Sequence, residues 1–256
     1  MRKSFRDNPA SALPALHPVT GQPMLLITMP WIPGAAWKLW IPEGAALASD
    51  KDRHFMSPRD IDWRRQEDRV FYRKEISDDR HYACGIRFEA QPVNNGVDLL
   101  VTVENRGTVE WPDYANLLVC LGCLTEEAFS DRDGTRTFVR VKGETRTVRD
   151  LVAVNQTLQY THFLTPPLED PQDELLVGHV DHGSIIRVSE DGIHSVVFWW
   201  DNAVRVDANF DTISCIHSHP QIGPLPPGTQ KECRGWIRIT QGDADQAARL
   251  FQPTPG

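Results

Sequence analysis

The chain of 256 residues has few cysteines, and their number is odd. They are Cys84, Cys120, Cys123, Cys215 and Cys233. Five cysteines in a chain of this length are too few for a disulfide framework, so free thiols in a reducing compartment are expected. The predicted location is therefore the cytoplasm.

Positive charge is also scarce. The chain has 27 Lys and Arg residues against 35 Asp and Glu residues, which gives a formal net charge of −8 at pH 7. The basic residues form no cluster along a helix or beside a stacking motif, so nucleic acid is not an expected partner. Apolar runs are short as well, because Pro30 and Pro33 interrupt "PMLLITMPWIPGAAW" well below the ~20 residues that cross a bilayer. Prolines also break the N-terminal segment, which lacks a signal-peptide core. No membrane partner is expected.

Several sequence motifs of common enzymes are absent. There is no Gly-rich phosphate loop, no G-x-S-x-G elbow and no H-E-x-x-H helix, so nucleotide binding, serine hydrolase chemistry and the common zinc peptidase mechanism have no support. Helical periodicity is scarce too. The clearest helix is predicted over residues 243–252, where Asp243 or Asp245 can cap the first turn.

Alternation of apolar and polar residues dominates the rest of the chain. "HYACGIRFEAQPV" and "VDLLVTVENRG" alternate on either side of "NNG", which predicts a hairpin with its turn at Asn95-Gly96. A second hairpin is predicted around Asp191-Gly192. We therefore predict an all-β fold, a large antiparallel β-sandwich with few short helices. One domain is predicted over residues 1–256, with residues 1–22 as a loop-rich N-terminal lead.

The stretch "CIHSHPQIGPLPPG" carries the first candidate site. In a strand, Cys215, His217 and His219 share one face, with successive side chains roughly 6.8 Å apart. Imidazole has an ordinary pKa of about 6.5, so the two histidines could transfer protons near neutrality, contact a substrate or bind a metal. The simpler alternative is that they donate hydrogen bonds to loop carbonyls at a strand end.

No cofactor is expected, although a divalent metal held by His217 and His219 is left open. Such a metal needs a further ligand. The candidates are His179, Asp181 and His182 of "HVDH", together with Asp201 and Glu232. The pair in "CLGC", Cys120 and Cys123, points to opposite faces of a strand and has no second CxxC partner, so buried thiols are predicted there instead of zinc ligands.

The stretch "FWWDNA" is the second candidate. An indole offers an apolar face to a sugar ring, and Asp201 and Asn202 supply directional hydrogen bonds beside Trp199 and Trp200. One of the two tryptophans must face the other side of its strand and enter the core. In "HVDH", polar loop residues are the alternative to a binding role.

The stretch "KECRGWI" contributes Glu232 and Arg234. If this strand pairs with residues 212–219, both side chains lie near the two histidines, and the arginine could hold a carboxylate or polarise a carbonyl. A solvated charge pair on an edge strand is the alternative.

The succession of "VVFWWDNA", "CIHSHPQIGPLPPG" and "RGWIRITQGD" resembles the large β-sandwich proteins of the galactose-mutarotase-like superfamily, over roughly residues 80–250. That superfamily includes sugar epimerases and polysaccharide-processing domains, so the resemblance implies a carbohydrate ligand. No catalytic assignment is carried over from it, because a shared fold does not establish a function.

The predicted function is an enzyme that acts on a sugar or sugar derivative, as a small molecule or oligosaccharide, by general acid–base chemistry of the epimerase or lyase type. The predicted catalytic residues are His217, His219, Asp201 and Arg234. The predicted substrate contacts are Trp199, Trp200, Asn202, His179, His182 and Glu232. The alternatives are a non-catalytic carbohydrate-binding domain and a metal-dependent β-barrel enzyme that uses His217 and His219. The sequence leaves the oligomeric state open, and the prediction requires the histidines, the tryptophans and Arg234 to line one concavity.

Overall fold

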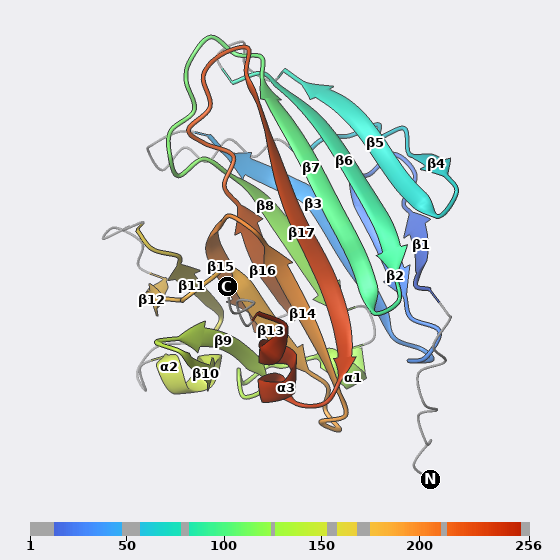
Figure 1. Ribbon diagram of the computed structural model, residues 1–256, viewed down its shortest axis with the longest axis vertical. Helices are drawn as coiled ribbons and strands as arrows, with labels where there is room; N and C mark the ends of the chain where they lie inside the picture. Colours follow the sequence, from blue (N-terminus) through green and yellow to red (C-terminus); the bar gives the residue numbers. More distant parts are fainter. Residues whose placement is uncertain are drawn as a thin grey trace, which may run out of the picture.

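Two stacked β-sheets account for most of the computed structural model (Figure 1), which describes residues 13–47, 57–77, 82–123, 126–152, 158–167, 175–210 and 214–251. Within these residues, sheet A has eight strands in the order β1 (Ala15–Pro18), β2 (Met24–Thr28), β3 (Ala36–Ala46), β8 (Asn116–Cys123), β16 (Cys215–Pro220), β15 (Ala203–Asn209), β11 (Tyr160–Leu164) and β12 (Leu176–His179). Sheet B has nine described strands, in the order β10 (Glu144–Thr147), β9 (Thr137–Val141), β13 (Ser184–Val188), β14 (His194–Trp200), β17 (Gln230–Gln241), β7 (Gly96–Asn105), β6 (Cys84–Val93), β5 (Arg69–Ile76) and β4 (Arg64–Gln66). The predicted antiparallel β-sandwich is confirmed.

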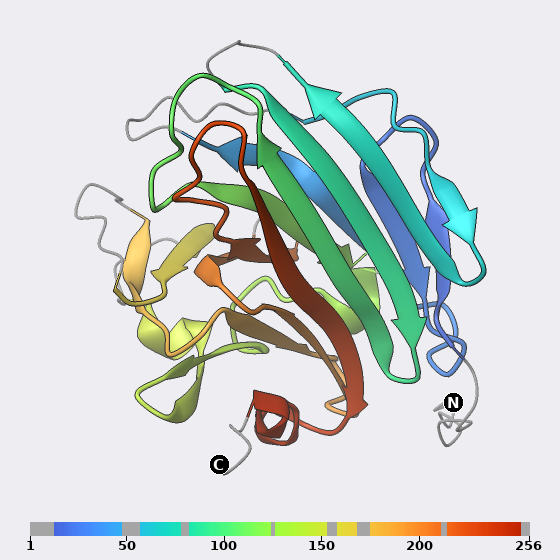
Figure 2. The ribbon, with the colours of Figure 1, turned by 45° about the horizontal axis from the view of Figure 1, so that its top comes forward.

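The pairing between neighbouring strands is antiparallel throughout the described sheets, except between β11 and β12. Figure 2 shows the long strands β5, β6, β7 and β17 of sheet B in front of β3 and β8 of sheet A. The core lies between the sheets because alternate residues of each strand point inward. Trp37 and Leu39 of β3, Phe88 of β6, Trp200 of β14 and Ile237 of β17 are fully or almost fully buried there.

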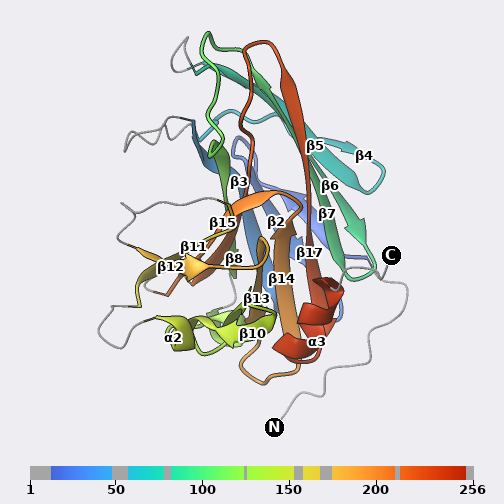
Figure 3. The same ribbon diagram turned by 60° about the vertical axis from the view of Figure 1, so that its left-hand side comes forward.

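The described helices are short: α1 (Glu126–Phe129), α2 (Val148–Leu151), α3 (Ala244–Ala248) and the 3-10 turn η1 (Arg249–Phe251). The predicted C-terminal helix is confirmed as α3, and Asp243, not Asp245, caps it through a capping box with Gln246. Helix α3 lies against the outer face of β13 and β14 (Figure 3). Its alanines pack there on Ile186, Val188 and Val197. No helix in the described ranges has the length and apolar character that crossing a membrane would take.

The predicted hairpin around residue 95 forms between β6 and β7, but its turn differs. Val93 pairs with Gly96, so the two-residue loop is Asn94-Asn95 and Gly96 already belongs to β7. Gly96 is needed for close packing, because a Cβ atom there would lie 1.9 Å from the carbonyl oxygen of Ile237 on β17. The second hairpin, β13–β14, turns at the predicted position, where Gly192 has a φ of 71°.

The N-terminal lead is less irregular than predicted. Residues 1–12 lie outside the described part of the chain, but Ala15–Pro18 form strand β1 on the edge of sheet A, paired with β2. Leu16 is buried in the core, and Pro18 is tolerated because it lies at the end of an edge strand. Pro14, His17 and Pro18 lie in or next to this strand, so the short alternation of buried and exposed residues was not recognised from the sequence.

Candidate functional site

A row of chemically active side chains crosses the outer face of sheet A, the face away from sheet B. The strand register places Cys120 of β8 opposite His217 of β16, His217 opposite Asp207 of β15, and Asp207 opposite His162 of β11. Directly opposed residues share one face of a sheet, and Ile216, beside His217, points into the core instead. We call these four residues the polar row. All four are buried.

Asp207 is the carboxylate of the polar row and is fully buried. Its Oδ2 accepts hydrogen bonds from His219 Nε2 at 2.7 Å and Tyr160 Oη at 3.4 Å, and it lies 3.0 Å from a guanidinium nitrogen of Arg205. Burial raises the pKa of Asp207, but the Arg205 and His219 neighbours outweigh it and hold the pKa well below its usual range. Asp207 is therefore an ionised carboxylate at neutral pH.

His219 uses both ring nitrogens inside the protein. Its Nε2 bonds Asp207, and its Nδ1 lies 3.1 Å from the backbone nitrogen of Val119 and 3.2 Å from the carbonyl oxygen of Leu117 on β8. Burial lowers the pKa of His219 to about 4 despite Asp207, so the ring is neutral at pH 7. A neutral ring can accept from Val119 N–H while donating to Asp207. His219 therefore connects β16 to β8 and has no nitrogen left for a substrate or a metal.

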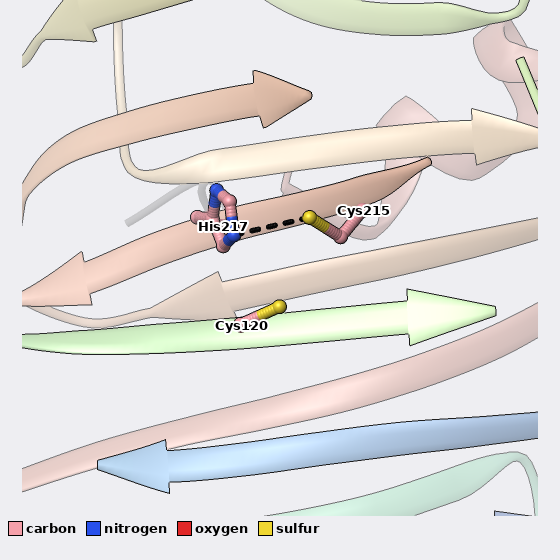
Figure 4. Close-up of side chains that lie close together, drawn as sticks. All are labelled: Cys120, Cys215 and His217. Atoms are coloured by element: carbon pink, nitrogen blue, oxygen red, sulfur yellow. Dashed lines mark hydrogen bonds between the residues drawn. The ribbon is translucent and has the colours of Figure 1, made fainter. Parts of the chain in front are cut away.

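His217 lies beside two cysteines. Its Nε2 is 3.3 Å from the Sγ of Cys215, and Cys120 lies next to both on β8 (Figure 4). A hydrogen bond from the Cys120 thiol lowers the pKa of Cys215, and His217 lowers it further although burial opposes both. Burial lowers the pKa of His217, but the Cys215 charge raises it above the ordinary value. The two shifts favour charge on the Cys215 thiol and a proton on the His217 ring.

The two tryptophans of β14 point to opposite sides, as predicted. Trp200 is fully buried in the core, so its predicted contact with substrate is wrong. Trp199 is half-buried on the outer face of sheet B, opposite Trp236 of β17, with ring centroids 5.4 Å apart. Only one of the pair can therefore serve as an aromatic wall.

A hollow of about 390 Å³ lies at the open end of the β13–β14 hairpin. Of its lining residues, His182 precedes β13 and Trp199 lies near the end of β14. Asp201 and Asn202 form the turn from β14 into β15. Gln221, which follows β16, closes another side. We call this cavity the Trp199 hollow. It brings together four of the residues predicted to form the site.

Two of the ionisable groups that line the Trp199 hollow, Asp201 and His182, have pKa values shifted in opposite directions. Burial raises the pKa of Asp201, even though backbone N–H groups, including that of Arg234, stabilise its charge. Burial lowers the pKa of His182, and the nearby Arg140 adds to the effect. His182 Nδ1 lies 2.8 Å from Ser184 Oγ, which orients the ring. An acid and a base with shifted pKa values thus line one cavity.

Contacts within the protein hold the Asn202 side-chain amide in place. Its Nδ2 donates to the carbonyl oxygen of Gln221 at 2.7 Å and contacts Cys233 Sγ at 3.4 Å. Its Oδ1 is buried and has no hydrogen-bond partner within the described residues.

Arg234 and Glu232 lie elsewhere. The predicted pairing of their strand with residues 212–219 is wrong, because β17 pairs with β14 and β7 in sheet B while β16 belongs to sheet A. Arg234 is exposed and forms an ion pair with Glu232 at 2.5 Å, which is the solvated charge pair considered as the alternative. Arg234 lines a second hollow of about 360 Å³, across Trp199 from the first.

The single concavity required by the sequence-based hypothesis is therefore not formed. His217 and His219 line neither of the two hollows beside Trp199. His179 ends β12 on the edge of sheet A and also lines neither. Asp207 and Arg205 were not predicted as site residues. Alternation in "NAVRVDANF" places them on one face of a strand, but their contact with the histidines follows only from the pairing of β15 with β16.

No family model matches the sequence, and no curated protein matches it. Among solved structures, a protein of Synechocystis sp. PCC 6803 superposes with a TM-score of 0.57 at 9% identity, covering 94% of this chain and 99% of that one. A proposed aldose 1-epimerase of Escherichia coli K12 superposes with a TM-score of 0.51 at 9% identity, covering 89% and 99%. The expected resemblance is thus confirmed at the level of the fold, which is the galactose mutarotase-like β-sandwich.

Proposed function

We propose that this protein is a carbohydrate isomerase of the epimerase type, with its reaction in the Trp199 hollow. The observation that carries this proposal is the joint presence of Asp201, His182 and Trp199 around one cavity. The volume of about 390 Å³ is within the range of small-molecule sites. The fold shared with a proposed aldose 1-epimerase supports the choice of sugar chemistry. A lyase would also need an acid and a base, but no other observation supports a lyase.

The chemistry follows from the state of each group at neutral pH. The Asp201 carboxylate removes the proton of the anomeric hydroxyl and passes it to the ring oxygen, while the neutral His182 imidazole donates a hydrogen bond that stabilises the charge developing on that oxygen. The bond between the anomeric carbon and the ring oxygen breaks with its electron pair on oxygen, which gives the open-chain aldehyde. Rotation of the aldehyde and reversal of both proton transfers yield the other anomer. Trp199 supports the sugar ring from the side of β14.

The test is to measure anomer interconversion over a panel of reducing sugars and sugar acids by polarimetry or NMR exchange. Asp201→Asn and His182→Gln are each expected to lower kcat/KM by about 10²-fold or more, as loss of a general acid or base, or of a hydrogen bond to a developing charge, does. Trp199→Ala is expected to raise KM. The matched control is His179→Gln, which changes a histidine outside the hollow and should turn over normally. Wild-type rates in both Asp201→Asn and His182→Gln would overturn the proposal.

A second candidate function is a carbohydrate-binding domain without catalysis. It is favoured by one observation, that Trp199 lines both hollows and so offers a continuous aromatic surface to a longer saccharide. Here Trp199→Ala would abolish oligosaccharide binding in calorimetric titration, while Asp201→Asn and His182→Gln would bind like the wild type. No sugar in the panel would then be converted by the wild-type protein.

A further inference from the structure

Three metal-binding side chains converge on the outer face of sheet A. Cys120 comes from β8, and Cys215 and His217 come from β16 (Figure 4). One ligand atom of each lies within 4.8 Å of the other two, and His217 Nε2 is 3.3 Å from Cys215 Sγ. Ligands of a tetrahedral zinc ion lie roughly 3.5–3.8 Å apart, as bonds of about 2.3 Å to sulfur and 2.0 Å to nitrogen require. Small side-chain movements would close the remaining difference.

We propose that Cys120, Cys215 and His217 bind a thiophilic divalent cation of the zinc class. Two thiolates and an imidazole select soft or borderline metals over Mg²⁺ and Ca²⁺, which prefer oxygen ligands. A divalent ion bound by two thiolates and a neutral imidazole carries no net charge.

The residue behind His217 has the chemistry of an outer-shell partner. Metal-bound histidines donate their second ring N–H to a carboxylate or a carbonyl, and this orients the ring. With Nε2 turned to Cys215, Nδ1 of His217 is the second nitrogen, and it is buried without a hydrogen-bond partner among the described residues. Asp207 lies opposite His217 in the register, and its Oδ1 is likewise buried and unpartnered in that part of the chain. One hydrogen bond from His217 Nδ1–H to Asp207 Oδ1 would satisfy both atoms.

A different ligand set is excluded by the same geometry. Asp207, His217 and His219 also lie within 4.8 Å of one another. Both nitrogens of His219 are engaged, however, by Asp207 and by the backbone of β8. The metal is therefore assigned to the cysteine side of His217.

Glu43 of β3 is an acidic residue whose charge acts on this cluster. It is half-buried, and its charge interacts with those of His217 and Cys215. Glu43 is not among the side chains whose ligand atoms lie within 4.8 Å of one another in this cluster, so a water molecule would take the fourth position. Variation of Glu43 should weaken the site less than loss of a cysteine, because three protein ligands would remain.

This inference goes beyond the proposed function, and the Trp199 hollow contains none of its ligands. The experiment that tests it measures metal binding instead of catalytic turnover. Protein purified under reducing conditions is stripped with a chelator and titrated with Zn²⁺ by calorimetry and with Co²⁺ by absorption spectroscopy. One equivalent is expected to bind. Co²⁺ should give a thiolate-to-cobalt charge-transfer band together with the intense visible bands of a tetrahedral site.

The variants separate this site from other thiols. Cys215→Ser and His217→Gln should lose the thiolate–cobalt spectrum, and Asp207→Asn should weaken Zn²⁺ binding by roughly 10–100-fold, as loss of an outer-shell partner does. Cys84→Ser, at a buried thiol outside the cluster, is the matched control and should bind like the wild type. Asp201→Asn should also bind normally, which keeps the test independent of the sugar reaction.

A measurement on the unaltered chain covers the case in which a variant does not fold. Zn²⁺ should protect Cys120 and Cys215 from alkylation, read by mass spectrometry of peptides, and leave Cys123 and Cys233 at their metal-free rates. The proposal is overturned if Zn²⁺ protects neither Cys120 nor Cys215, or if Co²⁺ binds without sulfur ligation.

Discussion

His219 Nε2 lies 2.7 Å from Asp207 Oδ2, and the other nitrogen of the same ring bonds the backbone of β8. The ladder between β16 and β8 ends at His217 and Cys120, and a single bridge follows at Asn116 and Gln221, so the His219 side chain connects the two strands across this gap. Asp207 in turn lies on β15, between Arg205 and the histidines. Three central strands of sheet A thus depend on one buried carboxylate.

Asp207→Asn is predicted to destabilise the protein strongly. Removing the charge leaves Arg205, whose side chain is only 11% exposed, without its counter-charge, and such losses cost about 3–5 kcal/mol in the free energy of unfolding. Urea unfolding followed by fluorescence measures the difference. The matched control is Asp98→Asn, which breaks the more exposed ion pair with Arg238 and should cost about 0–1 kcal/mol. Equal effects of the two substitutions would contradict this account.

The pH dependence of the proposed reaction should lie on the acid side of neutrality. Burial raises the pKa of Asp201 from its ordinary 3.8, and burial lowers that of His182 from 6.5. Asp201 must lose its proton to act as a base, and His182 must be neutral in its assigned role, so protonation of either group lowers kcat/KM. The acid limb should therefore fall between pH 3.8 and 6.5.

No loss of activity caused by His182 is expected as the pH rises above 6.5. The profile of kcat/KM from pH 4 to 9 checks this, because it reports ionisations of the free enzyme. A fall in kcat/KM between pH 6.5 and 8 that His182→Gln abolishes would show that His182 acts as an imidazolium that donates its proton, and not as a neutral hydrogen-bond donor.

Alternation and turn chemistry were enough to predict the sandwich, both hairpins and the C-terminal helix, because these depend on neighbours in the sequence. The separation of the two candidate clusters could not be predicted in this way. Trp199 belongs to β14 of sheet B and Asp201 follows that strand, whereas His217 belongs to sheet A, and sheet membership is decided by long-range pairing. Proximity in the sequence between residues 199 and 219 therefore did not mean a shared cavity.

The cysteines illustrate the same limit. The spacing of Cys120 and Cys123 correctly indicated opposite faces and argued against a site made by "CLGC" alone. The contact of Cys120 with Cys215 and His217 arises because β8 and β16, 95 residues apart between Cys120 and Cys215, are neighbours in sheet A. Single-sequence patterns do not report such a pairing, so the cluster is visible only in the folded chain.

Arg234→Gln is predicted to be nearly neutral for both stability and turnover. The Arg234 side chain is 71% exposed, and its ion pair with Glu232 is solvated, so the free energy of unfolding should change by less than about 1 kcal/mol. The residue reaches Asp201 through its backbone N–H, which the substitution retains. Thermal unfolding and the sugar assay measure both effects. A loss of kcat/KM near that of Asp201→Asn would return Arg234 to the catalytic set.

Gly235→Ala is predicted to disturb the aromatic wall from the strand behind it. A Cβ atom at Gly235 of β17 would lie 2.5 Å from Cδ2 of Trp200 and 2.7 Å from the carbonyl oxygen of Trp199. Trp200 is fully buried and cannot swing away, so β14 must shift, at a cost of about 1–3 kcal/mol. The shift moves Trp199, which should weaken sugar binding as well.

Gly178→Ala on β12 is the matched control for that substitution. No atom lies within 4 Å of the Cβ position at Gly178, so the added methyl group should change stability by less than about 1 kcal/mol. Chemical unfolding and sugar titration of both variants give the comparison. If Gly235→Ala is as stable as Gly178→Ala and binds sugar with wild-type affinity, the packing of Trp200 against β17 does not hold Trp199 in place.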